Sequence, residues 1–200
     1  MSHVNDCHQG YKRMSRWEPN ARGRLEQAAL DLYQERGYDQ TTVTEIAART
    51  GLTERTFFRH FADKREVLFG MQDGLLETCV QAIEAAPNSA TPIDTVMSAM
   101  EALAPMFQER HDITRQRQSV IEANPPLQER ELLKFAKFTQ AMADALKERG
   151  TSDAEAHLAA NTGALIFRTA YARWLAEQDE PDLLKLTQDS FNQLKQILAD

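Results

Sequence analysis

The chain has 200 residues, 42% of them hydrophobic, and a formal net charge of −7. This length and apolar content exclude a wholly disordered chain and allow one medium domain or two small ones. The charge is uneven, because residues 1–70 hold 11 Lys and Arg against 10 Asp and Glu, whereas residues 71–200 hold 12 against 20. A DNA-binding face needs local rather than overall positive charge, so the total does not exclude one near the N-terminus.

Membrane and secretion signals are absent from the sequence. No apolar run approaches the roughly 20 residues of a membrane-spanning helix, and the polar N-terminus has no signal-peptide core. Cys7 and Cys79 lie far apart on segments of different character, which indicates neither a disulfide framework nor a zinc site. We therefore expect a soluble, cytoplasmic protein without a metal or other cofactor.

The first residues predict a flexible arm. Residues 1–20 have no helical periodicity, and residues 1–24 hold five basic side chains against two acidic ones. We interpret residues 1–20 as a basic arm with solvated charge, and the alternative is an arm that follows a DNA groove.

Apolar residues at helical spacing predict a helix over residues 24–36, which Gly37 ends. Thr42 and Glu45 then form the Thr-x-x-Glu pattern that caps a second helix, and Gly51 ends it. Thr53 can cap a third, whose Phe57, Phe58 and Phe61 form an apolar set. Of these, we expect Phe57 and Phe61 in the core, together with Ile46 and the first helix.

Two short helices joined by a glycine-containing turn have the geometry that fits a DNA major groove. The second of them should read the bases, with Arg55 as first choice, because a bidentate Arg–guanine pair discriminates by about 1 to 3 kcal/mol. Lys64 and Thr42 would contact the DNA backbone and position the protein on it without reading the base sequence. The candidate DNA contacts are Arg24, Thr42, Thr53, Glu54, Arg55, Thr56, Arg59, His60 and Lys64.

Residues 22–70 resemble the TetR/AcrR family of bacterial transcriptional regulators. The likeness lies in the stretch RGYDQTTVTEIAARTGLTERTFFRHFADKREVLF, and Thr42, His60 and Lys64 match positions of the family pattern. The family often has a phosphate-binding Tyr where this chain has Phe58, so that hydroxyl contact does not carry over. The resemblance implies a homodimer formed by the last two long helices, and a palindromic operator that follows from its two-fold axis.

The rest of the chain is also helical in pattern. Asp63 and Glu66 predict the cap of a helix from Lys64 to about Glu84, in which Gly70 and Gly74 allow a bend. Five more helical patterns follow Pro92, and no strand pattern occurs. We therefore predict an all-α chain of about nine helices. Residues 21–70 would form the helix-turn-helix domain, and residues 71–200 the ligand-binding and dimerisation domain.

The last two helices carry small residues and an apolar stripe with the spacing of a two-helix seam. They predict the dimer interface, and the alternative is that both stripes are core within one chain. The candidate dimer residues are Ala160, Gly163, Ala164, Phe167, Leu184, Phe191, Leu194 and Leu198.

Met, aromatic and Arg side chains of the C-terminal part could line a ligand cavity, although most should be core. Residues 117–175 resemble mycofactocin-regulator-type members, chiefly in the Asn-Pro-Pro-Leu junction at 124–127 and in the Arg-Gly and Trp-Leu endings. This likeness implies an acyl-CoA-like ligand. The candidate pocket residues are Met97, Met100, Phe107, Arg110, Arg117, Phe135, Phe138, Met142, Arg168, Tyr171 and Trp174.

Together these features predict a DNA-binding regulator, most simply a repressor that a small lipophilic or acyl-CoA-like effector releases from a palindromic operator. Two alternatives are a helical protein-interaction module and a sensor of cationic lipophilic drugs. An enzyme is not expected, because the chain has no Gly-rich phosphate loop or HExxH motif, and His111 and His157 have no nucleophile in register.

Overall fold

The computed structural model describes residues 20–177 and 181–199, and every regular element in this part of the chain is an α-helix. The predicted all-α class is confirmed. The helices are α1 (Ala21–Arg36), α2 (Val43–Arg49), α3 (Glu54–His60), α4 (Glu66–Phe69), α5 (Gln72–Ala85), α6 (Pro92–Gln108), α7 (His111–Glu122), α8 (Pro125–Glu148), α9 (Asp153–Ala176) and α10 (Leu183–Ala199). The predicted arm, apart from Asn20, lies outside the described residues.

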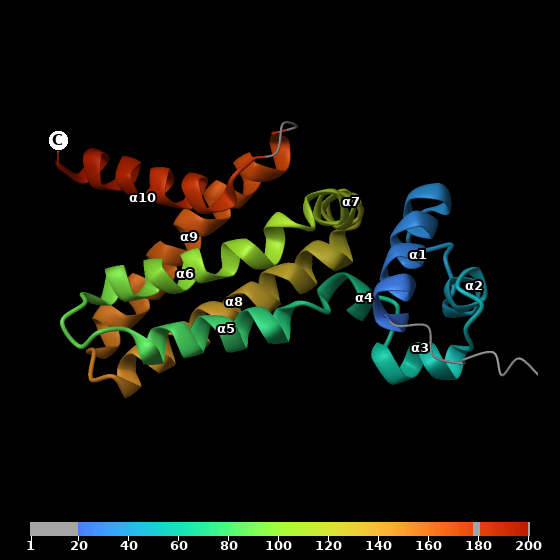
Figure 1. Cartoon of the computed structure of the whole chain (residues 1–200), viewed down its shortest axis with the longest axis horizontal. Helices are drawn as coiled ribbons and strands as arrows, with labels where there is room; N and C mark the ends of the chain where they lie inside the picture. Colours follow the sequence, from blue (N-terminus) through green and yellow to red (C-terminus); the bar gives the residue numbers. More distant parts are fainter. Residues whose placement is uncertain (1–19, 178–180, 200) are drawn as a thin grey trace, which may run out of the picture.

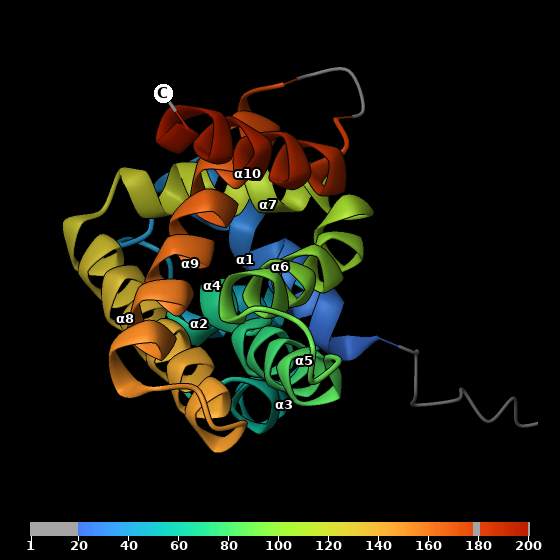
Figure 2. The same ribbon diagram turned by 90° about the vertical axis from the view of Figure 1, so that its left-hand side faces the viewer.

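The helices form a small N-terminal group and a larger, elongated bundle. Helices α1 to α3 lie together at one end of the molecule, α4 leads away from them, and α5 to α10 make up the bundle (Figure 1). A second view, along the bundle, places α5, α6, α8 and α9 around a shared interior and α10 across one side (Figure 2). The buried residues of these five helices form one continuous apolar core.

The predicted capping signals of the N-terminal group are confirmed. Thr42 accepts the backbone N–H of Glu45, and the Glu45 carboxylate accepts the backbone N–H of Thr42, which completes a capping box for α2. Thr53 caps α3 by accepting the N–H of Thr56. Gly51 has a φ of 68° in the turn between the two helices, a conformation that a residue with a Cβ rarely adopts.

Leu25, Ile46 and Phe57 are fully buried where α1, α2 and α3 meet. Burial of each such side chain contributes about 1.5 to 3 kcal/mol, so this small core fixes how α3 is presented. Phe57 and Phe61 are buried as expected, whereas Phe58 lies outside this core with 53% of its surface exposed. Phe57 and Phe58 are neighbours on a helix and cannot both face α1.

The bundle contributes to the N-terminal core. Val120 and Ile121 of α7 and Leu127 of α8 belong to the same buried cluster as the residues of α1 to α4. The first helices are therefore packed on the bundle and share apolar contacts with it.

The helix predicted from Lys64 to Glu84 is wrong as one element, because α4 ends at Phe69 and α5 begins at Gln72. Asp63 does accept the backbone N–H of Glu66, at 3.0 Å, as the predicted cap requires. A Cβ on Gly70 would lie 2.5 Å from an Arg22 guanidinium nitrogen, so the break admits a side chain from α1. The extra break accounts for the ten helices in residues 20–177 and 181–199, where about nine were expected for the chain.

Three predicted dimer residues belong to the core of a single chain. Ala160, Gly163 and Ala164 are buried between α9 and its neighbours, and a Cβ on Gly163 would lie 2.3 Å from a methyl group of Val96. The small side chains allow α6 to approach α9 within one subunit. For these residues the dimer assignment is wrong and the intrachain alternative holds.

Replacing Gly163 with Ala should lower the free energy of unfolding by about 1 to 3 kcal/mol, because the new methyl group overpacks the contact with Val96. Gly74→Ala is the matched control, since its Cβ would meet only Met106 at 3.7 Å. That change should stabilise α5 by about 0.5 to 1 kcal/mol through lower chain entropy. Chemical denaturation at one protein concentration measures both, and equal effects would contradict the packing of α9 on α6.

Candidate DNA-binding surface and ligand cavity

Helix α3 presents a face without partners elsewhere in the described residues. Arg55 and Arg59 are exposed, four residues apart, and no ion pair or hydrogen bond ties either side chain within that part of the chain. Phe58 lies between them with its ring half exposed. We call Arg55, Phe58 and Arg59 the reader face. It combines two donor-rich cations with one apolar ring, the functional groups that recognise guanine and the thymine methyl group.

The other candidates near α3 have structural contacts. The hydroxyls of Thr53 and Thr56 lie 3.1 Å apart at the start of the helix, and the Glu54 carboxylate accepts the hydroxyl of Thr44 on α2. These bonds orient α3 relative to α2. Thr53, Glu54 and Thr56 belong to the start of α3, and Arg55 and Arg59 are the cations of this helix without an ion pair or hydrogen bond among the described residues.

Lys64 is held by backbone carbonyls. Its ammonium donates to the carbonyl oxygens of Tyr38 at 2.8 Å, Asp39 at 3.3 Å and Thr41 at 3.0 Å, and it lies 4.4 Å from the Tyr38 ring centroid. These bonds use all three of its N–H donors. Lys64 therefore ties the loop before α2 to the start of α4, and the phosphate contact predicted for it would require the ammonium to leave these carbonyls.

Arg24 and His60 are also engaged in the fold. Arg24 donates to the carbonyl of Thr50 at 3.0 Å and so supports the end of α2. Burial, together with the nearby charges of Arg59 and Arg22, lowers the pKa of His60 below its ordinary value. At neutral pH its imidazole adds no positive charge to the surface.

Two adjoining cavities lie between the helices of the bundle, with volumes of about 320 and 290 Å³. The first, the bundle lobe, reaches Leu76, Leu103 and Phe138. The second, the α4 lobe, has Val67 to Met71 as one wall. Both are lined by Gln72, Leu75, Phe107, Glu131, Phe135 and Phe167. A ligand in the α4 lobe would contact the segment that follows the helix-turn-helix.

The predicted pocket residues divide into two groups. Six line the lobes: Phe107, Arg117, Phe135, Phe138, Arg168 and Tyr171. The other five do not line these two lobes: Met97, Met100, Met142 and Trp174 are packed in the core, and Arg110 pairs with Glu26 on α1. Periodicity identifies a buried face but cannot tell which buried face leaves a gap.

Two parts of the cavity lining were not predicted from the sequence: the charged residues of α8 in the bundle lobe, and the wall formed by Val67 to Met71. Glu131, Lys134 and Lys137 lie on the same side of α8 as Phe135 and Phe138, and all five line the bundle lobe. Charged and aromatic residues spaced three and four apart on one helix were the signal that could have found them. The α4 wall had no local signal.

The cavity contains paired and unpaired charges. Arg117 and Glu131 form an ion pair at 2.8 Å, whereas Arg168 is exposed and lies over the Phe135 ring at 5.6 Å. Burial raises the pKa of the Tyr171 phenol to about 12, with the nearby Arg117 acting in the opposite direction. Tyr171 thus remains a hydroxyl at neutral pH. Apolar walls with guanidinium and hydroxyl groups at one end suit an amphipathic ligand.

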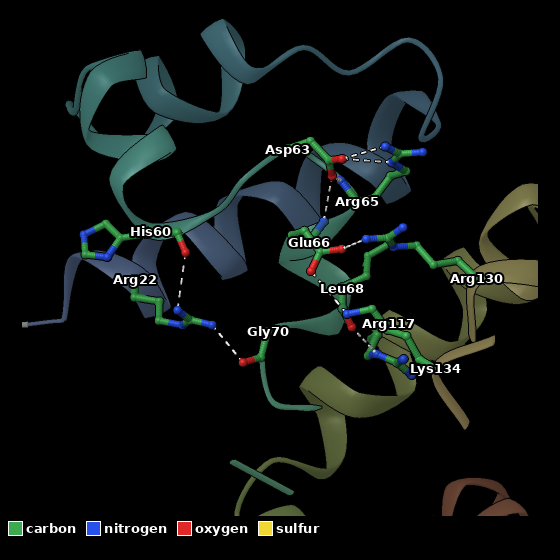
Figure 3. A network of polar contacts seen from close by, with 10 residues as sticks. All are labelled: Arg22, His60, Asp63, Arg65, Glu66, Leu68, Gly70, Arg117, Arg130 and Lys134. Carbon is green, nitrogen blue, oxygen red and sulfur yellow. Dashed lines mark hydrogen bonds and ion pairs between the residues drawn. The ribbon is translucent and has the colours of Figure 1, made fainter. Parts of the chain in front are cut away.

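A polar network joins α4 to the bundle (Figure 3). The Glu66 carboxylate accepts from Arg130 and, at 3.2 Å, from Lys134, both on α8. Burial opposes ionisation of Glu66, but the bonds from Arg130 and Lys134 outweigh it and hold the pKa low. Arg117 on α7 donates to the Leu68 carbonyl. We call these contacts of Glu66 and Leu68 the α4 joint.

Exposed apolar side chains lie along the last two helices. The exposed fractions are 71% for Leu158 and 53% for Leu165 on α9, and 71% for Ile197 and 76% for Leu198 on α10. Of the predicted dimer residues, Leu184 and Leu198 are exposed, Phe191 and Leu194 are half-buried, and Phe167 lines the cavity instead. The apolar surface thus lies on the faces of α9 and α10 that point away from the core.

Sequence profiles of known families match both parts of the chain. Residues 26–71 match the profile described as bacterial regulatory proteins of the tetR family, and residues 90–199 match that of the MftR C-terminal domain. The chain belongs to the TetR family. The N-terminal resemblance and the weaker C-terminal one predicted from sequence motifs are both confirmed.

Two curated relatives agree with this membership. The HTH-type transcriptional regulator TcmR of Streptomyces glaucescens is 37% identical over 82 residues, which are 41% of this chain and 36% of that protein. The putative mycofactocin biosynthesis transcriptional regulator MftR of Mycobacterium tuberculosis is 25% identical over 158 residues, 77% of this chain and 79% of the relative. The chain thus spans about a third of TcmR and most of MftR.

Solved structures share the fold. Thermus thermophilus FadR in complex with lauroyl-CoA has a TM-score of 0.54 at 22% identity, covering 86% of this chain and 91% of that one. The complex of SmeT with triclosan has a TM-score of 0.57 at 22% identity, covering 89% and 90%. SmeT is the repressor of a multidrug efflux pump in Stenotrophomonas maltophilia. Among the described helices of this chain, none has the length and apolarity to cross a membrane.

Replacing Lys64 with Met should lower the free energy of unfolding by about 1 to 2 kcal/mol, because three backbone carbonyls lose a charged donor. Arg55→Ala is the matched control and should change stability by less than about 0.5 kcal/mol, since its side chain is exposed and unpaired. Urea denaturation measures both changes. A Lys64 variant as stable as the control would mean that this loop does not depend on the ammonium.

Proposed function

We propose that this TetR-family transcriptional regulator binds a palindromic operator as a homodimer, represses transcription, and is released by a small lipophilic or acyl-CoA-like effector. The observation that carries the proposal is the position of α4. It follows the helix-turn-helix directly and forms one wall of the ligand cavity. A ligand in that cavity can therefore act on the segment that positions α3.

The reader face would enter the major groove. Arg55 lies near the N-terminal end of α3, the end from which such helices contact base edges, and its guanidinium is unengaged within the described residues. Arg59 would neutralise phosphate, and the exposed ring of Phe58 could meet a thymine methyl group. Domain limits of 21–70 for DNA binding and 71–200 for ligand and dimer remain part of the proposal.

The homodimer is supported by the exposed apolar residues of α9 and α10. A two-fold axis through this surface would give each subunit one half-site, separated by one helical turn of DNA, roughly 34 to 36 Å. The interface would use Leu158, Leu165, Leu184, Ile197 and Leu198 in place of the small residues that pack inside the chain.

Two solved relatives suggest different effectors, since FadR holds lauroyl-CoA and SmeT holds triclosan. For this chain the acyl class is favoured because the apolar walls end at Arg117, Arg168 and the Tyr171 hydroxyl. A cationic drug would need an available carboxylate. Glu131 is paired with Arg117 and Glu26 with Arg110, so only the exposed Asp73 and Glu122 line the lobes without an ion pair among the described residues. In either case the effector releases DNA only by its differential affinity for two conformers, typically 1 to 3 kcal/mol of coupling.

Selection of genomic fragments bound by the purified protein tests this function and yields the operator. Acyl-CoAs and lipophilic drugs are then titrated into the complex of the protein with the operator. One of these two classes of compound should weaken the binding of the protein to the operator. Failure to select any fragment at modest ionic strength would favour the protein-interaction module instead.

Arg55→Ala should weaken binding to the selected operator by about tenfold or more and relax the preference at one base pair, because a bidentate contact is lost. Arg115→Ala on α7 removes the same charge from an exposed position outside α3 and should leave the affinity within about twofold. Fluorescence anisotropy at two salt concentrations measures both. Equal loss in the two variants would show that Arg55 contributes only charge.

A double change of Leu165 and Leu198 to Glu should weaken self-association by about a hundredfold or more, because four carboxylates would be buried in the dimer. Leu132→Glu, at an equally exposed leucine on α8, should leave the dimer intact. Sedimentation velocity over a concentration series distinguishes them. An unchanged dimer in the double variant would place the interface elsewhere.

A further inference from the structure

Arg117 connects the cavity with α4. Its Nε donates to the Leu68 carbonyl on α4, and its Nη2 donates to Glu131 on α8 at 2.8 Å. The same guanidinium lies 5.2 Å from the Phe69 ring centroid and lines the α4 lobe. One side chain thus contacts the ligand space and the backbone of the helix that leads to the DNA-binding part.

The two hydrogen-bond partners of Arg117 differ in how easily they can be exchanged. The Glu131 side chain is 33% exposed and ends a flexible stem, so it can leave the guanidinium and be solvated. The Leu68 carbonyl is backbone and can separate from Arg117 only if one of the two moves. An anion in the α4 lobe would therefore compete with Glu131 first.

Other groups would assist an incoming anion. Arg168 lines the same lobe, and its guanidinium has no carboxylate partner within the described residues. The Tyr171 hydroxyl is available as a donor at neutral pH. The apolar part of such a ligand would lie between Phe107, Phe135 and Phe167, which line both lobes.

We propose, as an extension of the proposed function, that the effector is an amphipathic anion whose carboxylate or phosphate replaces Glu131 as the partner of Arg117, and that this exchange loosens the bond from Arg117 to Leu68. The guanidinium is planar, with donors in fixed directions, so turning its Nη groups toward a new anion redirects the Nε bond. Glu131, released from Arg117, lies three residues before Lys134 on α8 and can compete with Glu66 for that ammonium. Both halves of the α4 joint weaken together.

The first test measures anion binding by calorimetry with dodecanoate, lauroyl-CoA, dodecanol and dodecyltrimethylammonium. Glu131→Gln removes the competing carboxylate and should tighten dodecanoate binding by about fivefold to tenfold, while dodecanol binding stays unchanged. Glu129→Gln, an exposed neighbour on α8 outside the cavity, should change neither affinity. Equal binding of dodecanol and dodecanoate, or no effect of Glu131→Gln, would overturn the proposal. The comparison of lauroyl-CoA with dodecanoate distinguishes the two headgroups: tighter binding of lauroyl-CoA would indicate a phosphorylated headgroup, and tighter binding of dodecanoate a free carboxylate.

The second test follows α4 by amide hydrogen exchange over residues 66–71 with and without dodecanoate. Exchange in the wild type should rise at least several-fold on binding. Arg117→Lys keeps the positive charge but lacks the planar guanidinium with its donors in fixed directions. This variant should retain dodecanoate affinity within about fivefold and lose most of the rise in exchange. Arg115→Lys is the control and should respond as the wild type does.

The outcomes separate the two proposals. If dodecanoate binds and releases the operator but Arg117→Lys and the wild type respond alike, the exchange at Arg117 is wrong and the ligand-responsive function stands. If the predicted affinity and exchange changes occur but operator binding is unaffected, the exchange at Arg117 stands and the ligand-released repressor fails. Binding of dodecyltrimethylammonium alone would overturn the anionic ligand class.

Discussion

The attachment of a four-residue helix, α4, to α7 and α8 is the constraint on which the arrangement of the two parts depends. Glu66 lies between Arg130 and Lys134, Arg117 holds the Leu68 carbonyl, and three cations surround the Phe69 ring at 5.1 to 5.8 Å. A helix this short cannot be stable by itself. Its position is therefore set by neighbours that also line the cavity.

The strength of these contacts suits a reversible connection. The Glu66 pairs are about a quarter exposed, and ion pairs of this kind contribute modestly, because desolvation offsets much of the attraction. The apolar contacts of Val67, Leu68 and Phe69 are almost completely buried and hold α4 to the N-terminal core more firmly. Movement of α4 together with α1 to α3 would also require a shift against Val120, Ile121 and Leu127 of the bundle, which belong to the same buried cluster.

The comparison with other family members separates fold from specificity. FadR and SmeT share this fold at 22% identity, although one holds lauroyl-CoA and the other triclosan. In this chain a space lies between α4, α5, α6, α7, α8 and α9. A shared fold does not determine which ligand such a space accepts, because that depends on the side chains that line it. In this chain Arg117, Glu131, Arg168 and Tyr171, on α7, α8 and α9, supply polar groups to the lining of the α4 lobe.

The sequence by itself determined the helices other than the separate α4 and α5, the caps at Thr42 and Thr53, the turn at Gly51 and the family, because each depends on residues a few positions apart. It also identified the arginines of the reader face and six cavity residues. Only the tertiary structure decided that Lys64 binds carbonyls 23 to 26 residues away, that Gly163 packs on Val96, and that Glu66 meets Lys134 across 68 residues. Such contacts leave no periodic signal, since they depend on where separate helices come to lie in the folded chain.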